Sequence, residues 1–357
     1  MTRTMDRSSE LLRLQEAQDG DERAFEDLVG GRRVELRAHC YRILASLDDA
    51  DDAVQETLVR AWRGLGRFEA RSSVRTWLFA IATNAALDIA TKRNRRELPI
   101  DVEPGGEDGD RSPERLGENR WVGPYPTADM DSSIPLLEDR YIARENVELA
   151  FINVLQFLPA RQRAAFLLRE VLGFSAVETA TALELTVAAV NSSLQRARTR
   201  VNELAPKVSQ QAELRALGDT AAKALASQYS RAIERGDIGA LLALLTEDAT
   251  WSMPPFASTF RGHHDVAAFL QDSVFPERWR HLTAEANGQL AVAGYLLDES
   301  RDCYVAAALD VLELRNGRVA AVTGFLTDAA FASEELGMYP ASRGLFQRLG
   351  LPAQLAR

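Results

Sequence analysis

Two short amphipathic helices joined by a turn, predicted over residues 175–183 and 187–201, constrain this chain more than any other feature. Ser175 and Glu178 have the spacing of a capping box, which satisfies free backbone amides at a helix start. Thr186 can cap the second helix. Apolar residues recur at helical spacing, so each helix has one face for a core, and Leu185 between them is expected to pack inward. The two apolar sets are Val177, Ala180 and Leu183, then Val187, Val190, Leu194, Ala197 and Val201.

The opposite face of the second helix is polar and basic. It carries Asn191, Ser192, Gln195, Arg196, Arg198 and Arg200. Amide and hydroxyl groups suit base edges in a major groove, and guanidinium groups suit phosphates, so this face fits a DNA-recognition helix. An alternative is that these charges only solvate an exposed helix.

The residue pattern of this stretch resembles region four of the extracytoplasmic-function (ECF) sigma factors of the sigma-70 family. The matching segments are Leu158-Pro159 with Arg163, Leu168 to Glu170, Gly173 to Ser175, Glu178 to Ala180 and Arg196 to Arg198. Glu184 stands where the family usually has a turn glycine, and Asn191 and Ser193 stand where it often has Lys and Arg. The resemblance implies contact with the flap of the second-largest RNA polymerase subunit. It also implies binding of the minus-thirty-five element by Thr186, Asn191, Ser192, Gln195, Arg196, Arg198 and Arg200.

Length and composition limit the alternatives. The 357 residues predict two to three domains, and 46% hydrophobic with 26% charged residues is ordinary for a folded protein. A net charge of −10 requires any nucleic-acid surface to be segregated from the rest. Cys40 and Cys303 are isolated thiols that fit a reducing cytoplasm. No apolar run or signal-peptide core is present, so the sequence predicts a cytoplasmic protein without membrane segment, metal site or cofactor.

Residues 10–97 are predicted to form a helical domain. In the helix over 53–62, Val54, Leu58, Ala61 and Trp62 are expected to face inward, whereas Asp52, Gln55 and Glu56 form a polar outer face. A polar loop then opens into an aromatic helix with Trp77 and Phe79, followed by the basic cluster 92–96. Such a helix can stack exposed bases, and the alternative is that both aromatic rings belong to the core.

This domain resembles sigma region two. The pattern D-x-x-Q-E-x-x-x-x-x-W is present from Asp52 to Trp62, and S-x-x-T-W-L-x-x-I-A-x-N-x-x-x-D runs from Ser73 to Asp88. The resemblance implies that Asp52, Gln55 and Glu56 bind the clamp helices of the largest polymerase subunit. It further implies that a minus-ten base flipped out of the opened duplex is contacted by Arg71, Ser72, Ser73 and Asn84.

The linker over 98–140 begins with the acidic, glycine-rich stretch 101–110, which is expected to be flexible or extended. Trp121 to Pro126 supplies aromatic and proline anchors, which indicate either docking on another surface or a local turn cluster. By resemblance, this linker threads through the polymerase toward the RNA exit path. The region-four domain follows over 141–206.

Residues 207–340 are predicted to place helices before an antiparallel meander with an Asn316-Gly317 turn, which makes a conical α+β barrel. This order resembles the SnoaL-like, ketosteroid-isomerase-like family with its nuclear transport factor 2-like fold. Such cones enclose an apolar pocket. Asp248 is expected to end a helix and Asp310 to face outward, which leaves no acid–base pair and favours ligand sensing or protein contact over catalysis. The candidate lining is Trp251, Met253, Phe260, His264, Tyr295 and Asp310, and a tail covers 341–357.

The sequence therefore predicts a multidomain protein with two all-α sigma domains and a C-terminal α+β cone. Its expected function is to bind core RNA polymerase and direct promoter recognition and melting, without enzymatic activity of its own and with the cone regulating it. One alternative is a SnoaL-type isomerase, hydrolase or ligand sensor fused to a DNA-binding module, and another is a dimeric repressor with a ligand-binding domain. The helix with Gln55 and Glu56, together with Asn84, favours the sigma factor, because a repressor needs neither.

Overall fold

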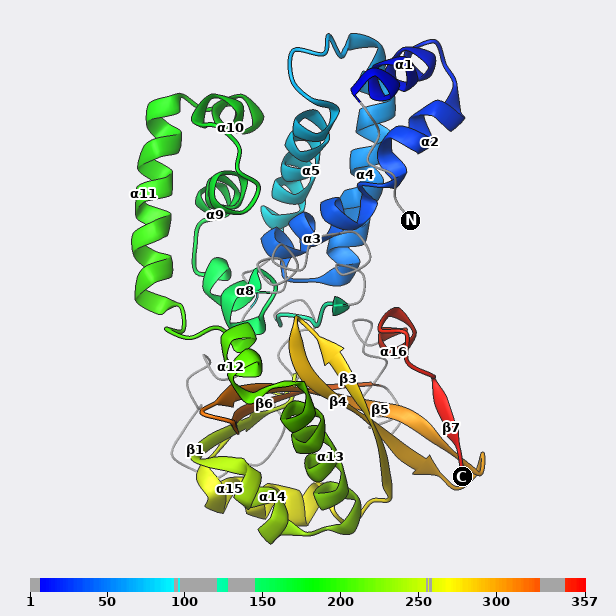
Figure 1. The fold of residues 1–357 in the computed structure, drawn as a ribbon, viewed down its shortest axis with the longest axis vertical. Coiled ribbons are helices and arrows are strands. Elements are labelled where there is room, and N and C mark those ends of the chain that lie inside the picture. Colours follow the sequence, from blue (N-terminus) through cyan, green and yellow to red (C-terminus); the bar gives the residue numbers. More distant parts are fainter. Residues whose placement is uncertain are drawn as a thin grey trace. The chain divides into compact units, whose positions relative to one another are not determined.

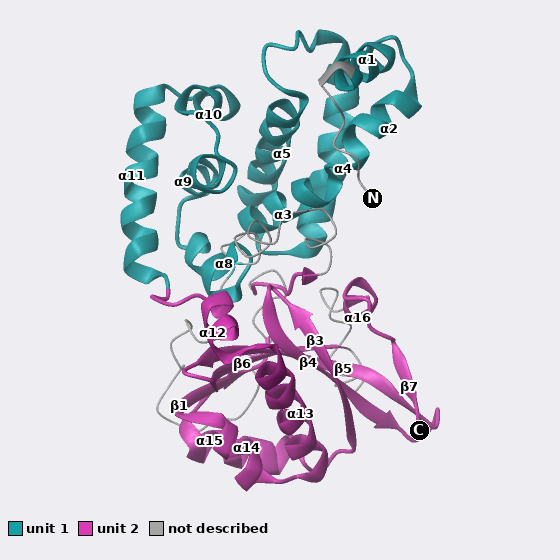
Figure 2. Ribbon diagram, in the orientation of Figure 1, with its two compact units in different colours: residues 1–96, 129–205 teal, residues 97–128, 206–357 magenta. Residues whose placement is uncertain are grey.

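The computed structural model describes residues 7–92, 96, 121–127, 145–254, 256, 259–327 and 344–357. The chain divides into two compact units, residues 1–96 with 129–205 and residues 97–128 with 206–357 (Figure 2). The acidic stretch 101–110, for which the sequence predicts a flexible or extended chain, lies outside the described residues. Across the described ranges, we find no helix with the length and apolar character that a membrane span requires.

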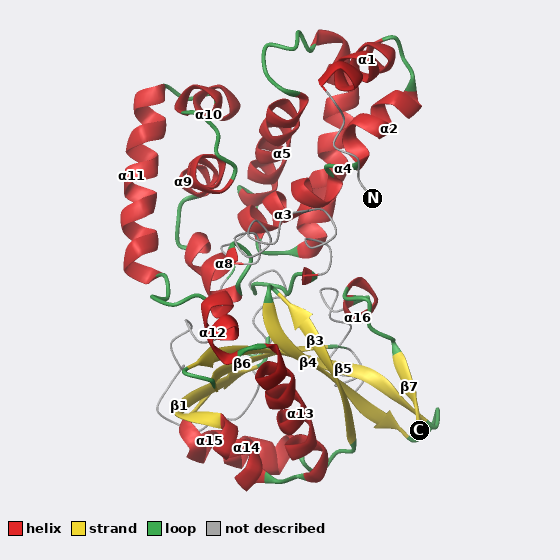
Figure 3. Cartoon of the chain, viewed as in Figure 1, coloured by secondary structure: helices red, strands yellow, loops and turns green. Residues whose placement is uncertain are grey.

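Unit 1 is helical throughout its described residues (Figures 1 and 3). The first helical module comprises α1 (Arg7–Gln18), α2 (Glu22–Gly30), α3 (Arg33–Leu44), α4 (Leu47–Gly64), the short 3-10 turn η1 (Leu65–Arg67) and α5 (Val74–Ala90). The second helical module comprises α8 (Leu149–Gln156), α9 (Ala160–Phe166), the π-turn η4 (Leu167–Val171), α10 (Ala176–Leu183) and α11 (Val187–Leu204). In the first module α3, α4 and α5 pack on one another around fully buried Tyr41 and Phe79.

The helix starts follow the capping residues in the sequence. Ser73 Oγ accepts a hydrogen bond from the Thr76 amide at the start of α5. At α10 the predicted capping box is confirmed, because the Glu178 amide donates to Ser175 Oγ at 3.1 Å and the Ser175 amide donates to Glu178 Oε2 at 2.8 Å. Thr186 caps α11 as predicted. Glu184 ends α10 with a positive φ of 53°, the conformation that favours the glycine this sequence lacks.

The two helical modules pack against each other within unit 1, with α5 against α9 and α10 and α3 against α8 and α9. Arg163 of α9 is buried and donates to the backbone carbonyl of Ile43 at the end of α3. Arg42 Nε donates to the Asn146 carbonyl at 3.1 Å. These buried guanidinium groups join the second module to the end of α3, because each satisfies a backbone carbonyl that the other module contributes.

Unit 2 is a curled sheet with most of its helices on one face (Figures 1 and 3). The helices are α12 (Gln210–Leu217), α13 (Asp219–Arg235), α14 (Ile238–Leu244), α15 (Gly262–Phe269) with the π-turn η5 (Leu270–Val274), and α16 (Leu345–Arg348). The strands are β1 (Leu245–Ser252), β2 (Thr259–Arg261), β3 (Trp279–Ala286), β4 (Gln289–Asp298), β5 (Cys303–Arg315), β6 (Arg318–Leu326) and β7 (Gln354–Ala356). Their order is β2-β1-β6-β5-β4-β3, with β7 paired to β5.

The predicted meander is confirmed for β3 to β6, whose neighbours pair antiparallel. Strand β1 instead pairs parallel with β6, since α15 and η5 carry the chain across to the far edge before the meander begins. Register shifts between Gly294 and Tyr295 and between Glu313 and Leu314 bend the sheet into the cone.

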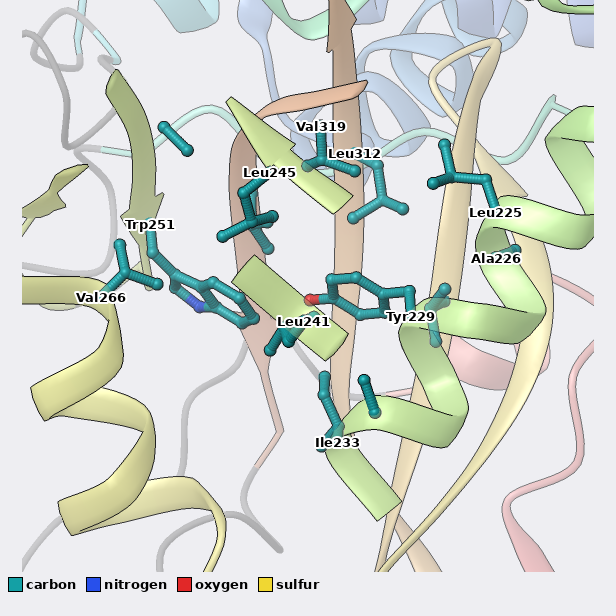
Figure 4. Packing of buried hydrophobic residues seen from close by; sticks show 14 of the residues in the cluster. Leu225, Ala226, Tyr229, Ile233, Leu241, Leu245, Trp251, Val266, Leu312 and Val319 are labelled. Carbon is teal, nitrogen blue, oxygen red and sulfur yellow. The ribbon is translucent and has the colours of Figure 1, made fainter. Parts of the chain in front are cut away.

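Apolar side chains of α13, α14, α15 and the inner sheet face form the core of unit 2 (Figure 4). Tyr229 of α13 and Trp251 of β1 face each other across this interior, with ring centroids 6.0 Å apart and planes inclined by 16°. Trp251 also lies beside Phe269, with centroids 6.1 Å apart. The interior of the cone is therefore packed with large aromatic rings.

Residues 121–127 belong to unit 2, although they lie between the two helical modules in the sequence. Trp121 and Tyr125 are buried. The Tyr125 amide donates to Asn287 Oδ1 and the Asn287 amide donates to the Tyr125 carbonyl, both at 2.8 Å, and the Gly288 amide donates to Thr127 Oγ1 at 2.9 Å. The surface on which this linker segment docks is therefore the turn between β3 and β4.

Candidate functional site

The outer face of α4 is polar and open. Asp52, Gln55 and Glu56 are all exposed, while the opposite face of the helix is buried against the module core. Glu56 Oε1 accepts a hydrogen bond from Arg60 Nε at 2.7 Å, and Arg60 Nη1 also donates to Asp88 at 2.9 Å. Glu56 thus lies in a surface ion-pair chain, whereas Asp52 and Gln55 point toward solvent.

Two apolar side chains extend this face. Val59 is exposed, and Trp62, predicted to face inward, is 37% exposed and packs one side of its ring against Phe25 with centroids 5.1 Å apart. The prediction for Trp62 is wrong in part, because Phe25 covers only one side of its ring and the other side is open. Exposed valine and tryptophan beside carboxylate and amide groups suit a protein partner better than a nucleic acid.

The four candidate minus-ten residues lie along α5 and do not converge on one point. Arg71 extends into solvent beside Glu69, Ser72 is half-buried, and Ser73 caps the helix. Asn84 lies about three turns further along, roughly 16 Å by the helical rise. Its side-chain amide Nδ2 donates to the Ala182 carbonyl of α10 at 3.0 Å. A strand that contacted all four residues would have to run along α5.

The aromatic residues of α5 are structural. Phe79 is fully buried and meets His39 edge-on with centroids 5.3 Å apart. Burial lowers the pKa of His39 to about 3, so the neutral ring shares a hydrogen bond of 2.8 Å with Thr83. Trp77 is half-buried and stacks on Phe68 at 4.6 Å. Base stacking on Phe79 is excluded in this arrangement, and the core interpretation applies to it.

The candidate minus-thirty-five residues form an open face on α11. Exposed side chains along it are Thr186, Asn191, Ser192, Gln195, Arg196, Arg198 and Arg200. The three arginines have partners within the protein: Arg196 donates to Ser192 at 2.6 Å, Arg198 pairs with Glu170 at 2.7 Å and Arg200 pairs with Glu203 at 3.3 Å. All three contacts are exposed, so phosphates can replace them at little cost.

Two valines near these helix starts depart from the prediction. Val177 is 66% exposed and Val187 is 40% exposed, although the sequence predicts both on the apolar faces of α10 and α11. Each lies in the first turn of its helix, where no neighbouring helix covers it. Leu185 is only half-buried, while Val190 and Leu194 are buried as predicted.

Four of the six candidate pocket residues lie in or against the interior of the cone, and the other two do not. Trp251 is core, and Met253 and Phe260 pack against that core. His264 is exposed on α15. Tyr295 lies with the tail instead, where its ring meets Phe346 of α16 edge-on and its hydroxyl donates to the Pro352 carbonyl at 3.0 Å.

Asp310 points into the cone, contrary to the prediction that it faces outward. Tyr229 donates its hydroxyl hydrogen to Asp310 Oδ2 at 2.9 Å. A methyl group at Gly324 would approach Asp310 Oδ1 to 2.9 Å, so glycine leaves the space that this carboxyl group occupies. Burial raises the pKa of Asp310 to about 6. Asp248 was expected to end a helix and instead lies in β1, where it pairs with Arg315.

We expect Asp310→Asn to stabilise unit 2, and more so at neutral than at acidic pH. The asparagine has the same shape and still accepts from Tyr229, but it carries no charge to bury. Because the folded-state pKa of about 6 exceeds the ordinary value of 3.8, the folded protein binds the proton more tightly. The free energy of unfolding therefore falls as pH rises from about 4 to about 6, and it levels off above that range. The total fall is up to ~3 kcal/mol for a shift of roughly two pKa units.

Thermal or urea unfolding of both proteins at about pH 4 and about pH 7.5 checks this expectation. The stability difference should be small at the acidic pH and largest at the neutral one. An equal difference at both pH values would contradict a buried, ionising carboxyl group.

Among the described residues, no three His, Cys, Asp or Glu side chains are grouped as metal ligands.

The chain matches three family models in succession. Sigma-70 region 2 covers residues 20–96, sigma-70 region 4 covers residues 148–201, and the SnoaL-like domain covers residues 226–322. The first two matches include the exposed polar faces of α4 and α11, and helix α5 with Asn84. The third covers the helices and strands of the cone.

Individual relatives agree with these models. The ECF RNA polymerase sigma factor SigG of Mycobacterium tuberculosis is 38% identical over 307 residues, which is 84% of this chain and 80% of that protein. The RNA polymerase sigma-H factor of Pseudomonas aeruginosa is 30% identical over 190 residues, 53% of this chain and 90% of that protein. The crystal structure of the ECF sigma factor SigJ of M. tuberculosis shares the fold, with a TM-score of 0.52 at 20% identity over 84% of this chain and 95% of that one. The chain therefore belongs to the extracytoplasmic-function sigma factors of RNA polymerase, transcription-initiation factors of the sigma-70 family, and carries a SnoaL-like domain at its C-terminal end.

Proposed function

We propose that this protein binds core RNA polymerase in the cytoplasm through the outer face of α4 and directs it to promoters. The loop 71–73 and Asn84 contact the opened minus-ten strand, and the exposed face of α11 binds the minus-thirty-five duplex. The observation that carries the proposal is the separation of surfaces on one helical unit. An acidic, partly apolar face with Asp52 and Gln55 suits protein, whereas the face with Arg196 and Arg198 suits phosphates.

Run-off transcription with purified core polymerase on genomic fragments tests this function directly. The full chain is expected to produce defined transcripts that core polymerase alone does not make. Binding of the chain to the same fragments without any polymerase-dependent transcript would instead favour the repressor alternative.

We propose that the cone regulates the helical modules and is not an enzyme. Hydrogen bonds between the β3–β4 turn and residues 121–127 support this proposal, because that segment connects the two sigma regions in the sequence. The interior of the cone is filled by Tyr229, Trp251 and Phe269. The enzyme alternative rests on Asp310, whose carboxyl group is already engaged by Tyr229 inside this packed core.

Asn287→Gly is expected to release the linker segment and raise transcription severalfold. Glycine keeps the positive φ of 54° that the turn requires, but it removes the acceptor for the Tyr125 amide. Loss of one such hydrogen bond shifts an equilibrium by ~1 kcal/mol, or about fivefold. The freed segment becomes available to the polymerase, in line with the path that the family resemblance implies for it.

Asn316→Gly is the matched control, since Asn316-Gly317 forms the corresponding turn between β5 and β6, also with a φ of 54° and with Asn316 exposed. Hydrogen exchange over residues 121–127 and run-off transcription are measured for both variants. If exchange rises in Asn287→Gly while transcription stays at the control level, the cone does not regulate through this segment.

A further inference from the structure

The exposed face of α11 divides into two chemically different halves. Every exposed side chain from position 187 to position 195 is neutral, and the arginines begin only at position 196. We call the exposed residues of the first half the neutral stripe, and its members are Val187, Ala188, Asn191, Ser192 and Gln195. Because phosphates attract cations and base edges require neutral donors, acceptors and apolar groups, the two halves suit different parts of a duplex.

The neutral stripe is continuous along the helix. Side chains four positions apart are neighbours on a helix surface, which joins Val187 to Asn191, Ala188 to Ser192 and Asn191 to Gln195. From Val187 to Gln195 the helix rises by about 12 Å, at ~1.5 Å per residue. Base pairs follow one another at ~3.4 Å, so the stripe has the length of roughly three to four base pairs.

The groups on the stripe match the major-groove edge of an A·T pair. Adenine offers an acceptor and a donor that the amide of Asn or Gln binds with two hydrogen bonds, and thymine offers a methyl group for apolar contact. Asn191 and Gln195 supply the amides, and Val187, which is 40% exposed, supplies apolar surface in the first turn. Guanine is bound most often by Arg or Lys, and the stripe contains neither.

The arginines of the second half lie beside the stripe or beyond it. Arg198 pairs with Glu170 of η4 at 2.7 Å, and Arg200 pairs with Glu203 at 3.3 Å. Arg196 is the nearest to the stripe, because it donates to Ser192 at 2.6 Å. A guanidinium group on each side of the base-reading residues is the arrangement that holds phosphates on the walls of a groove.

This chain also differs from its relatives at the stripe. Asn191 and Ser193 stand where the family often has Lys and Arg, so α11 lacks two cations in the half that enters the groove in helix-turn-helix proteins. The base preference of this chain therefore follows from its own side chains.

We propose that the neutral stripe makes this factor select A·T base pairs in the minus-thirty-five element. Asn191 and Gln195 bind adenines, and Val187 with Ala188 contacts thymine methyl groups. The arginines from position 196 onward hold phosphates. The inference rests on the proposed function, because that function assigns α11 to the minus-thirty-five duplex.

Randomised templates test this selection with the full chain and core polymerase. In a genomic fragment that the factor transcribes, the minus-thirty-five element is randomised, and the templates that yield run-off transcripts are sequenced. A·T pairs are expected to be enriched at three to four consecutive positions. Enrichment of guanine or cytosine there, or no enrichment, would overturn the inference while leaving the sigma function intact. No transcript from any fragment would refute the proposed function itself.

An exchange of amide for guanidinium identifies the residue that reads the base. Asn191→Arg is expected to change the preference at one position of the element from adenine to guanine, by roughly tenfold. Asn202→Arg is the matched control, since it adds the same charge at an exposed position about 16 Å further along α11. The control should strengthen binding to all templates without a change of preference. Identical base profiles for the two variants would exclude Asn191 as a base reader.

Modified bases test the same contacts without any change in the protein. A 7-deazaadenine lacks the N7 acceptor, and a deoxyuridine lacks the methyl group of thymine. At the selected positions each replacement is expected to weaken binding of the factor–polymerase complex severalfold, about fourfold for one lost methyl contact. Val187→Ala should reduce the discrimination against deoxyuridine, whereas Val177→Ala, at an exposed position of α10, should leave it unchanged. Undiminished binding to both modified templates would overturn the inference.

Discussion

A variant with Asp52→Arg and Gln55→Ala is expected to lose co-elution with core RNA polymerase in gel filtration while it stays folded. Both side chains are exposed on the outer face of α4, so their replacement removes no packing and changes stability by about 0.5 kcal/mol or less. The arginine reverses a charge in a surface that the proposed function places against a protein partner. Like-charge contacts in an interface cost several kcal/mol, enough to weaken binding by orders of magnitude.

Asp27→Arg is the control for this variant. It makes the same charge reversal at an exposed position of α2, outside the α4 face. The control should elute with core polymerase like the parent protein, and far-ultraviolet circular dichroism should be unchanged for both variants. Undiminished co-elution of the α4 variant would remove this face from the polymerase interface.

The second large effect is expected for Asn84→Ala, which should reduce transcription from duplex templates roughly tenfold or more. A well-placed contact between an amide side chain and a base edge contributes about 1–3 kcal/mol to discrimination. The change also removes the hydrogen bond to Ala182, which by itself loosens α10 from α5. We expect the loss of the base contact to affect transcription more than the loosening of α10, because the promoter strand loses a direct binding partner.

A template with a mismatched bubble at the minus-ten element separates the two consequences. Unpairing is then supplied in advance, so activity of the alanine variant should recover in part. Asn202→Ala, at an exposed position near the end of α11, is the matched amide control and should behave like the parent protein on both templates. Equal activity of the Asn84 variant and the parent on ordinary duplex would rule out this contact.

The sequence by itself determined the helix-turn-helix and most of the cone. Ser175, Glu178 and Thr186 fix the starts of α10 and α11 through hydrogen bonds within one turn of the chain. The Asn316-Gly317 turn fixes the register between β5 and β6 through its positive φ angles. These features are local, so spacing and residue type suffice to predict them.

Burial was predicted less well, because it depends on which distant elements arrive. Val177 and Val187 follow the apolar spacing of their helices, yet both remain exposed where no neighbour covers the first turn. Asp310 alternates with apolar residues on β5, and only the position of Tyr229 on α13, 81 residues away, shows that the carboxyl group points inward.

Tertiary structure alone decided which surfaces are occupied. The anchors Trp121 and Tyr125 indicate docking, but the turn that binds Tyr125 lies at Asn287, 162 residues further along the chain. The hydrogen bond from Asn84 to Ala182 spans 98 residues and joins two modules that the sequence presents as separate domains. Periodicity and capping arise from interactions within a few residues, so a local sequence pattern is enough to predict them. Which element covers a given surface depends instead on the packing free energy of whole helices and strands, and no local pattern contains that information.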